Sequence, residues 1–220
     1  LLCKNKNTTE ILSFMKKAIL SIAAIAGVTA AAQAQIKFAP EVGLNITTMK
    51  TSSNSTSSES KSLTGLKAGA FVELQFNKMV SLEPGIFYSR KGGEYQLFGA
   101  TTTTTLDYVE VPVNLKFSLP LGIGGRPFVY AGPYFAYGVS GERTVSSSLG
   151  SLSSDVNFGS GSAQTNPLDI GAQVGIGYQL PVIGLYARAQ YGMGFTNLSN
   201  ASNTTTTNNS NFAVSVGWQF

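Results

Sequence analysis

The sequence predicts an all-β fold, an eight-stranded antiparallel up-and-down transmembrane β-barrel. Apolar residues recur at every second position in eight separate segments, which is the period of a strand with one apolar face. Only 12% of the 220 residues are charged, against about 25% in a typical soluble domain. The connections between the segments alternate between short and long, as they do in barrels whose strands cross a membrane.

The N-terminal residues are set apart from the predicted barrel. From Met15, a basic pair is followed by an apolar stretch and an Ala-Gln-Ala site, which together predict a signal peptide over 15–34, cleaved before Gln35. A short membrane anchor is the alternative, but the stretch is too short and too rich in alanine. We interpret residues 1–14 as an upstream extension and 35–220 as the barrel.

The basic balance of the whole chain belongs mostly to this leader. The chain has a formal net charge of +4, but eleven of its cations and ten of its anions lie in 35–220, which leaves +1 there. The sole cysteine, Cys3, also precedes the barrel. We therefore expect no nucleic-acid partner and no disulfide or thiolate metal site in the exported protein.

The first four strands each have one apolar face, with polar or small residues between. They are predicted at 36–47, 65–77, 79–91 and 106–119, and their apolar faces include Val42, Leu74, Ile86 and Val111. These segments have roughly 10–14 residues, and a tilted membrane strand needs about 9–11.

The last four strands are predicted at 127–139, 168–180, 184–195 and 208–220. The strand 127–139 is apolar or small on both faces, so alternation does not orient it. The other three place Ile176, Ala189 and Val214 on their apolar faces.

Short and long connections fall on opposite sides of the predicted barrel. The short ones are 77–78, 120–126 and 181–182, and the long ones, rich in Ser, Thr and Asn, are 51–64, 92–105, 140–166 and 197–210. Short periplasmic turns and long outer loops are typical of outer-membrane barrels. The low complexity of the long loops favours mobility over a shaped pocket.

A soluble eight-stranded barrel has the same period and is the main alternative fold. Its outward face would have to carry charge. Here one face of each strand is nearly free of charge, and the other holds Gly, Gln, Ser and Asn with one or two charges. That second face suits a narrow, filled interior better than a solvated exterior, so the membrane barrel is favoured.

Aromatic residues gather toward both ends of the strands, as in the interfacial girdles of such barrels. The expected girdles are Phe38, Phe76, Phe117, Phe128, Tyr178 and Phe220 near the short turns, and Tyr88, Tyr108, Tyr137 and Phe195 near the long loops.

The chain ends in the alternating stretch NNSNFAVSVGWQF, which includes Trp218 and Phe220. The last strand must pair with the first to remove the open sheet edge. A closing strand with a terminal aromatic resembles the signal by which bacterial outer-membrane barrels are recognised for assembly. We therefore assign Trp218 and Phe220 to such a signal and expect the barrel-assembly machinery and outer-membrane lipid as partners.

Longer stretches carry a family resemblance. GLKAGAFVELQFNKMVSLEPGIFYSRKGGEY, LDYVEVPVNLKFSL and FVYAGPYFAYG resemble the PorT-like outer membrane β-barrel family of Bacteroidota, often labelled porin family. The resemblance covers most of 36–220 and is most specific in LEPG and VEVPVNLKF. It implies a barrel in the outer membrane of the cell envelope. Some relatives are implicated in type IX secretion and gliding, but no residue here carries that role over.

The sequence offers little for catalysis. It contains no histidine, and its one cysteine lies in the upstream extension, so the usual acyl-transfer arrangements are missing. The glycine-rich GIGG at 122–125 lacks the lysine and helix of a phosphate loop. We expect no enzyme, no cofactor and no metal site.

One cluster of charges stands out on the polar faces. Its members, all three to six residues from a turn or strand start at the short-turn end, are Glu41, Glu73, Glu83, Lys116 and Arg188, with Lys67, Glu110 and Asp169 expected near the other rim. Eight strands enclose a lumen only wide enough for side chains, so these charges must pair. A structural polar plug is favoured by that width, and a gated, narrow ion path is the alternative.

Several roles remain compatible with this fold. The leading hypothesis is a monomeric outer-membrane protein with a structural or surface-interaction role through four long extracellular loops. The alternatives are a narrow porin or ion channel and an accessory of a secretion system.

Overall fold

The computed structural model describes residues 35–53, 56–97, 99–121, 124–148, 150–159, 161, 164–199 and 205–220. The predicted upstream extension 1–14 and signal peptide 15–34 lie outside these residues. The described chain forms strands β1 (Gln35–Ser53), β2 (Thr56–Glu59), β3 (Lys61–Gln75), β4 (Val80–Leu97), β5 (Ala100–Ser118), β6 (Arg126–Ser147), β7 (Gly150–Asp155), β8 (Leu168–Leu180), β9 (Leu185–Gly194) and β10 (Thr205–Trp218). Among the same residues, no helix is long and apolar enough to cross a membrane.

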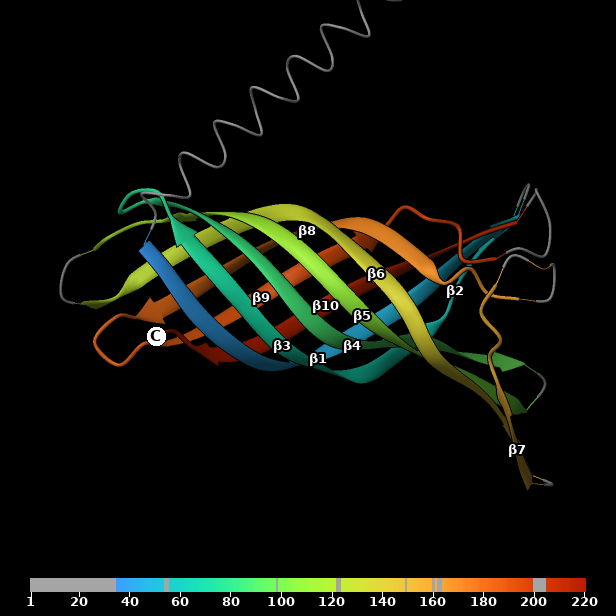
Figure 1. Cartoon of the computed structure of the whole chain (residues 1–220). Helices are drawn as coiled ribbons and strands as arrows, with labels where there is room; N and C mark the ends of the chain where they lie inside the picture. The colour runs from blue at the N-terminus through green and yellow to red at the C-terminus, as the bar shows by residue number, and fades with distance from the viewer. Residues whose placement is uncertain are drawn as a thin grey trace, which may run out of the picture.

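Eight of these strands close into a barrel (Figure 1). They pair antiparallel in the order β1, β3, β4, β5, β6, β8, β9, β10, and β10 pairs back with β1 from Glu41↔Gly217 to Ser53↔Thr205. The predicted eight-stranded antiparallel barrel is therefore confirmed. The short strands β2 and β7 lie beyond the ring, where β2 pairs with β1 and β7 pairs with β6.

The two faces of the wall differ as the alternation predicts. Apolar side chains such as Val42 (50% exposed) and Ile176 (63%) point outward, whereas Glu41 (4%) and Asn45 (0%) point inward. An outer surface this apolar is stable only against lipid, because a soluble protein of this size rarely exposes so large a contiguous apolar patch.

The strand that alternation could not orient, β6, places aromatic rings inside the barrel. Phe128 and Tyr130 are buried, while Val129 and Phe135 face outward. The neighbouring β8 sets glycines opposite these rings, with the pairs Phe128↔Gly177, Tyr130↔Gly175 and Tyr134↔Gly171. A Cβ on any of these glycines would overlap the facing ring, so the glycines make room for the aromatic filling of the lumen.

Short turns gather at one end of the barrel, as expected. They connect β3 to β4 through 76–79, β5 to β6 through 119–125, and β8 to β9 through 181–184. The start of β1 and the C-terminus lie at this same short-turn end (Figure 1). We call the opposite end the hairpin end.

At the hairpin end, three of the four long segments that were expected to be loops are largely strand. Much of 51–64, 92–105 and 140–166 is strand, because β1, β4, β5 and β6 continue past the ring. The extensions form two small sheets, β4-β5-β6-β7 and β10-β1-β2. Part of the fourth segment, 197–210, also joins β10.

The expected aromatic girdles need two corrections. Phe128 and Tyr108 are buried in the lumen, at 3% and 0% exposed. The other expected girdle residues that are well exposed are Phe38, Phe76, Phe117, Tyr178 and Phe220 toward the short turns, and Tyr137 and Phe195 toward the hairpin end.

Candidate functional site

The lumen brings together the five charged residues that the sequence singled out. They come from β1, β3, β4, β5 and β9, and each is buried: Glu41, Glu73, Glu83, Lys116 and Arg188. Lys116 Nζ lies 2.8 Å from a carboxylate oxygen of Glu73 and 2.8 Å from one of Glu83. Arg188 pairs with Glu41 at 3.0 Å and with Glu83 at 3.2 Å. Glu83 therefore links both cations into one network.

Aromatic rings surround the Arg188 guanidinium. Its carbon Cζ lies 4.6 Å from the ring centre of Phe71, 4.8 Å from those of Tyr130 and Tyr186, and 5.5 Å from that of Phe128. A desolvated cation over aromatic faces gains about 2 kcal/mol or more. The rings therefore compensate for part of the hydration that the guanidinium loses on burial.

Lys67, expected near the other rim, instead joins the charged network to a layer of amides. Its Nζ lies 3.9 Å from Glu41 and donates a 2.9 Å hydrogen bond to Gln190 Oε1. Gln190 donates to Gln173 at 3.1 Å, and Gln173 donates to Asn114 at 2.8 Å. These amides form a layer that crosses the lumen on the side of the cluster nearer the hairpin end.

A second ion-paired group lies nearer the hairpin end. Lys91 Nζ is 2.7 Å from Glu110 and 3.3 Å from Asp169, and its Nζ also lies 4.3 Å from the ring centre of Tyr134. Asn209 donates to Asp169 at 3.1 Å. Glu110 and Asp169 thus lie near this rim as expected, with Lys91 as the cation that the sequence analysis missed.

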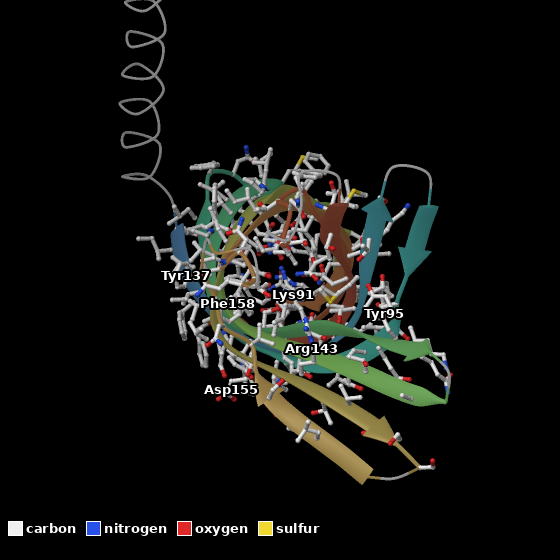
Figure 2. The ribbon with its side chains drawn as sticks, turned by 90° about the vertical axis from the view of Figure 1, so that its right-hand side faces the viewer. Lys91, Tyr95, Tyr137, Arg143, Asp155 and Phe158 are labelled. Carbon is white, nitrogen blue, oxygen red and sulfur yellow. The ribbon has the colours of Figure 1, made fainter. Side chains whose placement is uncertain are left out.

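An apolar layer closes the lumen toward the hairpin end. Its buried members include Met49, Leu106 and Leu198, and Tyr108 packs among them. Above this layer is a hollow of about 690 Å³ between the two extension sheets. Figure 2, which looks into the hairpin end, shows Lys91 near the middle of the ring and Arg143 beside the same opening.

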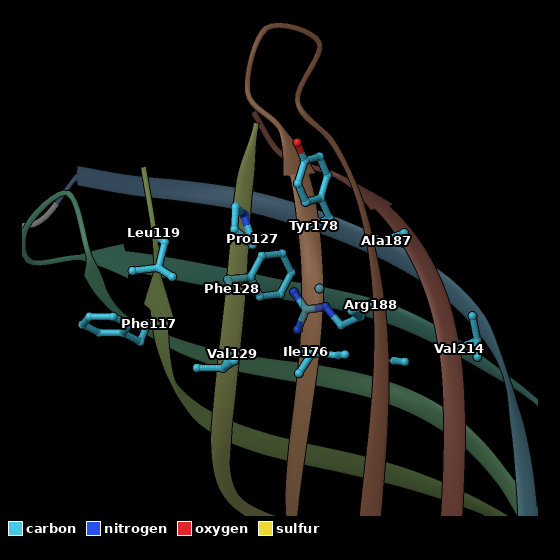
Figure 3. Close-up of a pocket in the computed structure, with 12 residues that line it drawn as sticks. Phe117, Leu119, Pro127, Phe128, Val129, Ile176, Tyr178, Ala187, Arg188 and Val214 are labelled. Atoms are coloured by element: carbon cyan, nitrogen blue, oxygen red, sulfur yellow. The ribbon is translucent and has the colours of Figure 1, made fainter. Parts of the chain in front are cut away.

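Another cavity, of about 560 Å³, lies in the barrel wall near the short-turn end (Figure 3). Its lining combines outward residues such as Val129 and Ile176 with the inward Phe128 and Arg188. The small residues Gly177, Ala187 and Ala189 leave the wall thin there. Most of its lining is apolar and belongs to the lipid-facing surface. The Arg188 guanidinium beside it is already paired with Glu41 and Glu83, so the cavity offers little for recognition of a specific ligand.

The C-terminal residues follow the same inside–outside alternation. Trp218 and Phe220 are exposed, and their rings stack with centres 6.0 Å apart. Gln219 points inward and donates to Glu73. The Phe220 N–H bonds Phe38 O at 2.9 Å, so the end of the chain is tied to β1.

Three kinds of lumen residue escaped the sequence analysis. They are the cation Lys91, the aromatic fillers Phe71, Phe87, Tyr130, Tyr134 and Tyr186, and the amides Gln173, Gln190 and Asn114. The signal was present, because Phe71, Phe87 and Lys91 all occupy the face of their strand opposite to its apolar face. The prediction considered only the charged residues of that face and so did not include the aromatic rings that pack around them.

The described residues were compared with the side-chain groups that usually bind metal ions. They contain no group of three or more His, Cys, Asp or Glu side chains that could hold a metal ion. The carboxylates Glu41, Glu73, Glu83, Glu110 and Asp169 all contact ammonium or guanidinium groups instead.

A closed antiparallel barrel with an apolar outer wall and a filled polar lumen defines a transmembrane β-barrel of the outer-membrane type. The chain belongs to the outer membrane protein beta-barrel domain family, whose profile matches residues 31–200. Outer membrane localisation follows from that membership.

Solved structures of bacterial barrels resemble the chain at low identity. Ail, the attachment invasion locus protein of Yersinia pestis, is 12% identical, with 84% of this chain and 98% of that chain covered and a TM-score of 0.43. Neisserial surface protein A is 14% identical, with 83% and 97% covered and a TM-score of 0.42. The N-terminal barrel domain of Pseudomonas aeruginosa OprF is 14% identical, with 81% and 97% covered and a TM-score of 0.33. No curated protein matches the chain.

Proposed function

We propose that the protein is a non-conducting outer-membrane barrel that acts at the cell surface by presenting its hairpin end to a partner outside the cell. The filled lumen carries this proposal. Two ion-paired groups, an amide layer and an apolar layer occupy successive levels of the barrel. With the interior occupied, the extension sheets are the part of the molecule that is available for interaction.

A narrow porin or ion channel is the second candidate. The charges inside the barrel favour it, because rings of charged side chains line many ion pathways. It requires that the side chains around Arg188 move apart to admit water. The charged groups of the described ion pairs would then contact water in place of each other.

The finer family assignment is also part of this proposal. LEPG and VEVPVNLKF support a PorT-like barrel of Bacteroidota, and a role beside a secretion machine is a third candidate. The proposal further includes cleavage of the signal peptide before Gln35, a monomeric state, no enzymatic activity, and contacts with outer-membrane lipid and the barrel-assembly machinery.

Single-cysteine labelling in intact cells tests the surface role. The barrel 35–220 has no cysteine of its own, so one introduced thiol is unique there. We expect Ser151→Cys, on the exposed strand β7, to react with a membrane-impermeant maleimide. The matched control is Lys78→Cys, in an exposed short turn, which should react only after the cells are broken open.

Both variants must insert, which heat-modifiable migration on gels reports. Labelling of Lys78→Cys but not of Ser151→Cys in intact cells would reverse the orientation and overturn the proposal. Ion conductance of the pure wild-type protein in planar bilayers would replace it with the channel.

A further inference from the structure

The hollow at the hairpin end has the size of a ligand site. Its volume of about 690 Å³ falls within the range of about 300–1,000 Å³ that small-molecule pockets occupy. The lining comes from both extension sheets and from the loops after β7 and β9: Met49, Thr51, Tyr95, Thr102, Thr104, Leu106, Arg143, Val145, Gln164, Thr165, Leu198, Ser199 and Thr207.

One wall is set by the register of β5 and β6. Thr104 pairs with Arg143, and Thr102 pairs with Val145. Directly opposed residues of an antiparallel pair project from the same face of the sheet. The threonine hydroxyls and the guanidinium therefore face the hollow together.

The opposite wall is cross-linked by hydroxyl groups. Tyr95 OH donates to Met49 O at 3.1 Å and lies 3.3 Å from Thr51 Oγ1. Thr51 Oγ1 lies 3.1 Å from Thr207 Oγ1. Tyr95 belongs to β4, so its contacts with β1 join the two extension sheets. Thr51 and Thr207 oppose each other on β1 and β10, so their contact lies within one sheet.

The loops after β7 and β9 form the remaining wall of the hollow, and the apolar layer forms its floor. Asn166 N–H donates to Leu198 O at 3.0 Å, and Leu198 N–H donates to Thr207 O at 2.9 Å. This anchors Leu198, which is 2% exposed, beside Leu106 (0%) in the apolar layer. The hollow is thus a pocket that ends above the lumen.

The charged groups that line the pocket are of one sign only, positive. Arg143 is the one charged residue among the lining residues of the described chain, and no ion pair between described residues involves it. The carboxylates nearest along its hairpin, Glu142 and Asp155, oppose each other across β6 and β7. They lie one position away from Arg143 and its partner Ser154, and so project from the other face.

We propose that this pocket binds a small polyhydroxylated ligand that carries one anionic group, such as an acidic monosaccharide. The carboxylate of the ligand pairs with the Arg143 guanidinium in a bidentate, charge-assisted contact. Its hydroxyl groups exchange hydrogen bonds with Thr102 and Thr104. The inference rests on the proposed surface function and names the class of ligand that this surface takes.

Titration calorimetry of the intact barrel in detergent micelles tests the inference, with glucuronate as the probe. We expect wild type to bind glucuronate with a Kd of about 1 mM or tighter. Arg143→Gln should weaken that binding by about tenfold or more, because it removes a charge-assisted contact and keeps a polar side chain. Arg126→Gln, which removes the same charge from the other end of β6, should bind as wild type does.

Two further probes separate the parts of the ligand. Glucose, which lacks the carboxylate, should bind wild type more weakly than glucuronate does and should not distinguish wild type from Arg143→Gln. Inorganic sulfate should bind more weakly than glucuronate. The steric variant Thr102→Phe should abolish glucuronate binding while heat-modifiable migration remains normal.

Absence of glucuronate binding to folded wild type, or binding unchanged in Arg143→Gln, overturns the inference. Sulfate binding as tight as glucuronate binding overturns the ligand class. These measurements do not depend on orientation in the cell. Surface labelling of Ser151→Cys without glucuronate binding therefore refutes only the ligand site, and failure of the labelling refutes the proposed surface function.

Discussion

Arg188 is the residue on which the interior of the barrel depends most. It is 3% exposed, it pairs with Glu41 and Glu83, and four rings lie over its guanidinium. A buried ion pair is costly to break from one side, because the remaining charge stays buried without compensation.

We expect Arg188→Ala to lower the free energy of unfolding by about 3–5 kcal/mol, the usual cost of removing one partner of a buried pair. Urea unfolding in detergent micelles measures this change. Wild-type protein should stay electrically silent in planar bilayers.

The matched control is Arg90→Ala. The Arg90–Asp107 pair is shorter than either Arg188 pair, at 2.7 Å, but the Arg90 side chain is 45% exposed, so its loss should cost no more than about 1 kcal/mol. If wild type conducts, and Arg188→Ala shifts its selectivity toward cations with little loss of stability, the cluster lines an ion path and the plug is refuted.

Much of this residue-scale arrangement could be predicted from the sequence. Alternation alone placed Glu41 and Arg188 inside and Val42 and Ile176 outside. It could not show that Phe128 and Tyr130 fill the lumen, because β6 is apolar on both faces and the glycines that admit those rings lie on β8. Which carboxylate meets which cation depends on the register of strands far apart in the chain.

At the scale of strands, the membrane explains why the alternation of apolar and polar residues ends before the strands do. Within the bilayer, one face of a strand meets lipid and the other meets the polar lumen, so apolar and polar residues alternate. Beyond it, both faces of β5 meet water or a polar pocket, and the run of threonines at 101–105 loses the alternation. Threonine nevertheless favours strands, which is why β5 continues where a loop was expected.

The end of β10 provides a prediction at this scale. We expect deletion of Trp218–Phe220, or Phe220→Ser alone, to lower the amount of folded protein in the outer membrane. The exposed terminal aromatic would be lost as an assembly signal, and the deletion would also remove the hydrogen bond from Phe220 N–H to Phe38 O. Quantitative immunoblotting of membrane fractions measures the change.

Gln219→Ala serves as the control, because it removes the inward contact with Glu73 and keeps both outward rings. It should insert at the wild-type level. Equal insertion of the truncated and full-length proteins would contradict the assignment of Trp218 and Phe220.

For the whole molecule, we expect export, cleavage and barrel insertion. The mature protein should begin at Gln35, fractionate with the outer membrane, and migrate faster on gels before heating than after, because the closed hydrogen-bonded ring resists detergent until it is boiled. N-terminal sequencing and semi-native electrophoresis measure these properties. Recovery as a soluble periplasmic protein would contradict the membrane assignment.

The ion pair between Glu41 and Arg188 has a consequence for how the ring closes. Glu41 lies on β1 and Arg188 on β9, so the pair reaches across β10 at the seam where the first and last strands of the barrel meet. Slippage of that seam by one residue would turn Glu41 toward lipid and leave the guanidinium without one of its carboxylates. The buried charges therefore favour the native register over one shifted by a single residue, because in the native register Arg188 keeps both of its carboxylates.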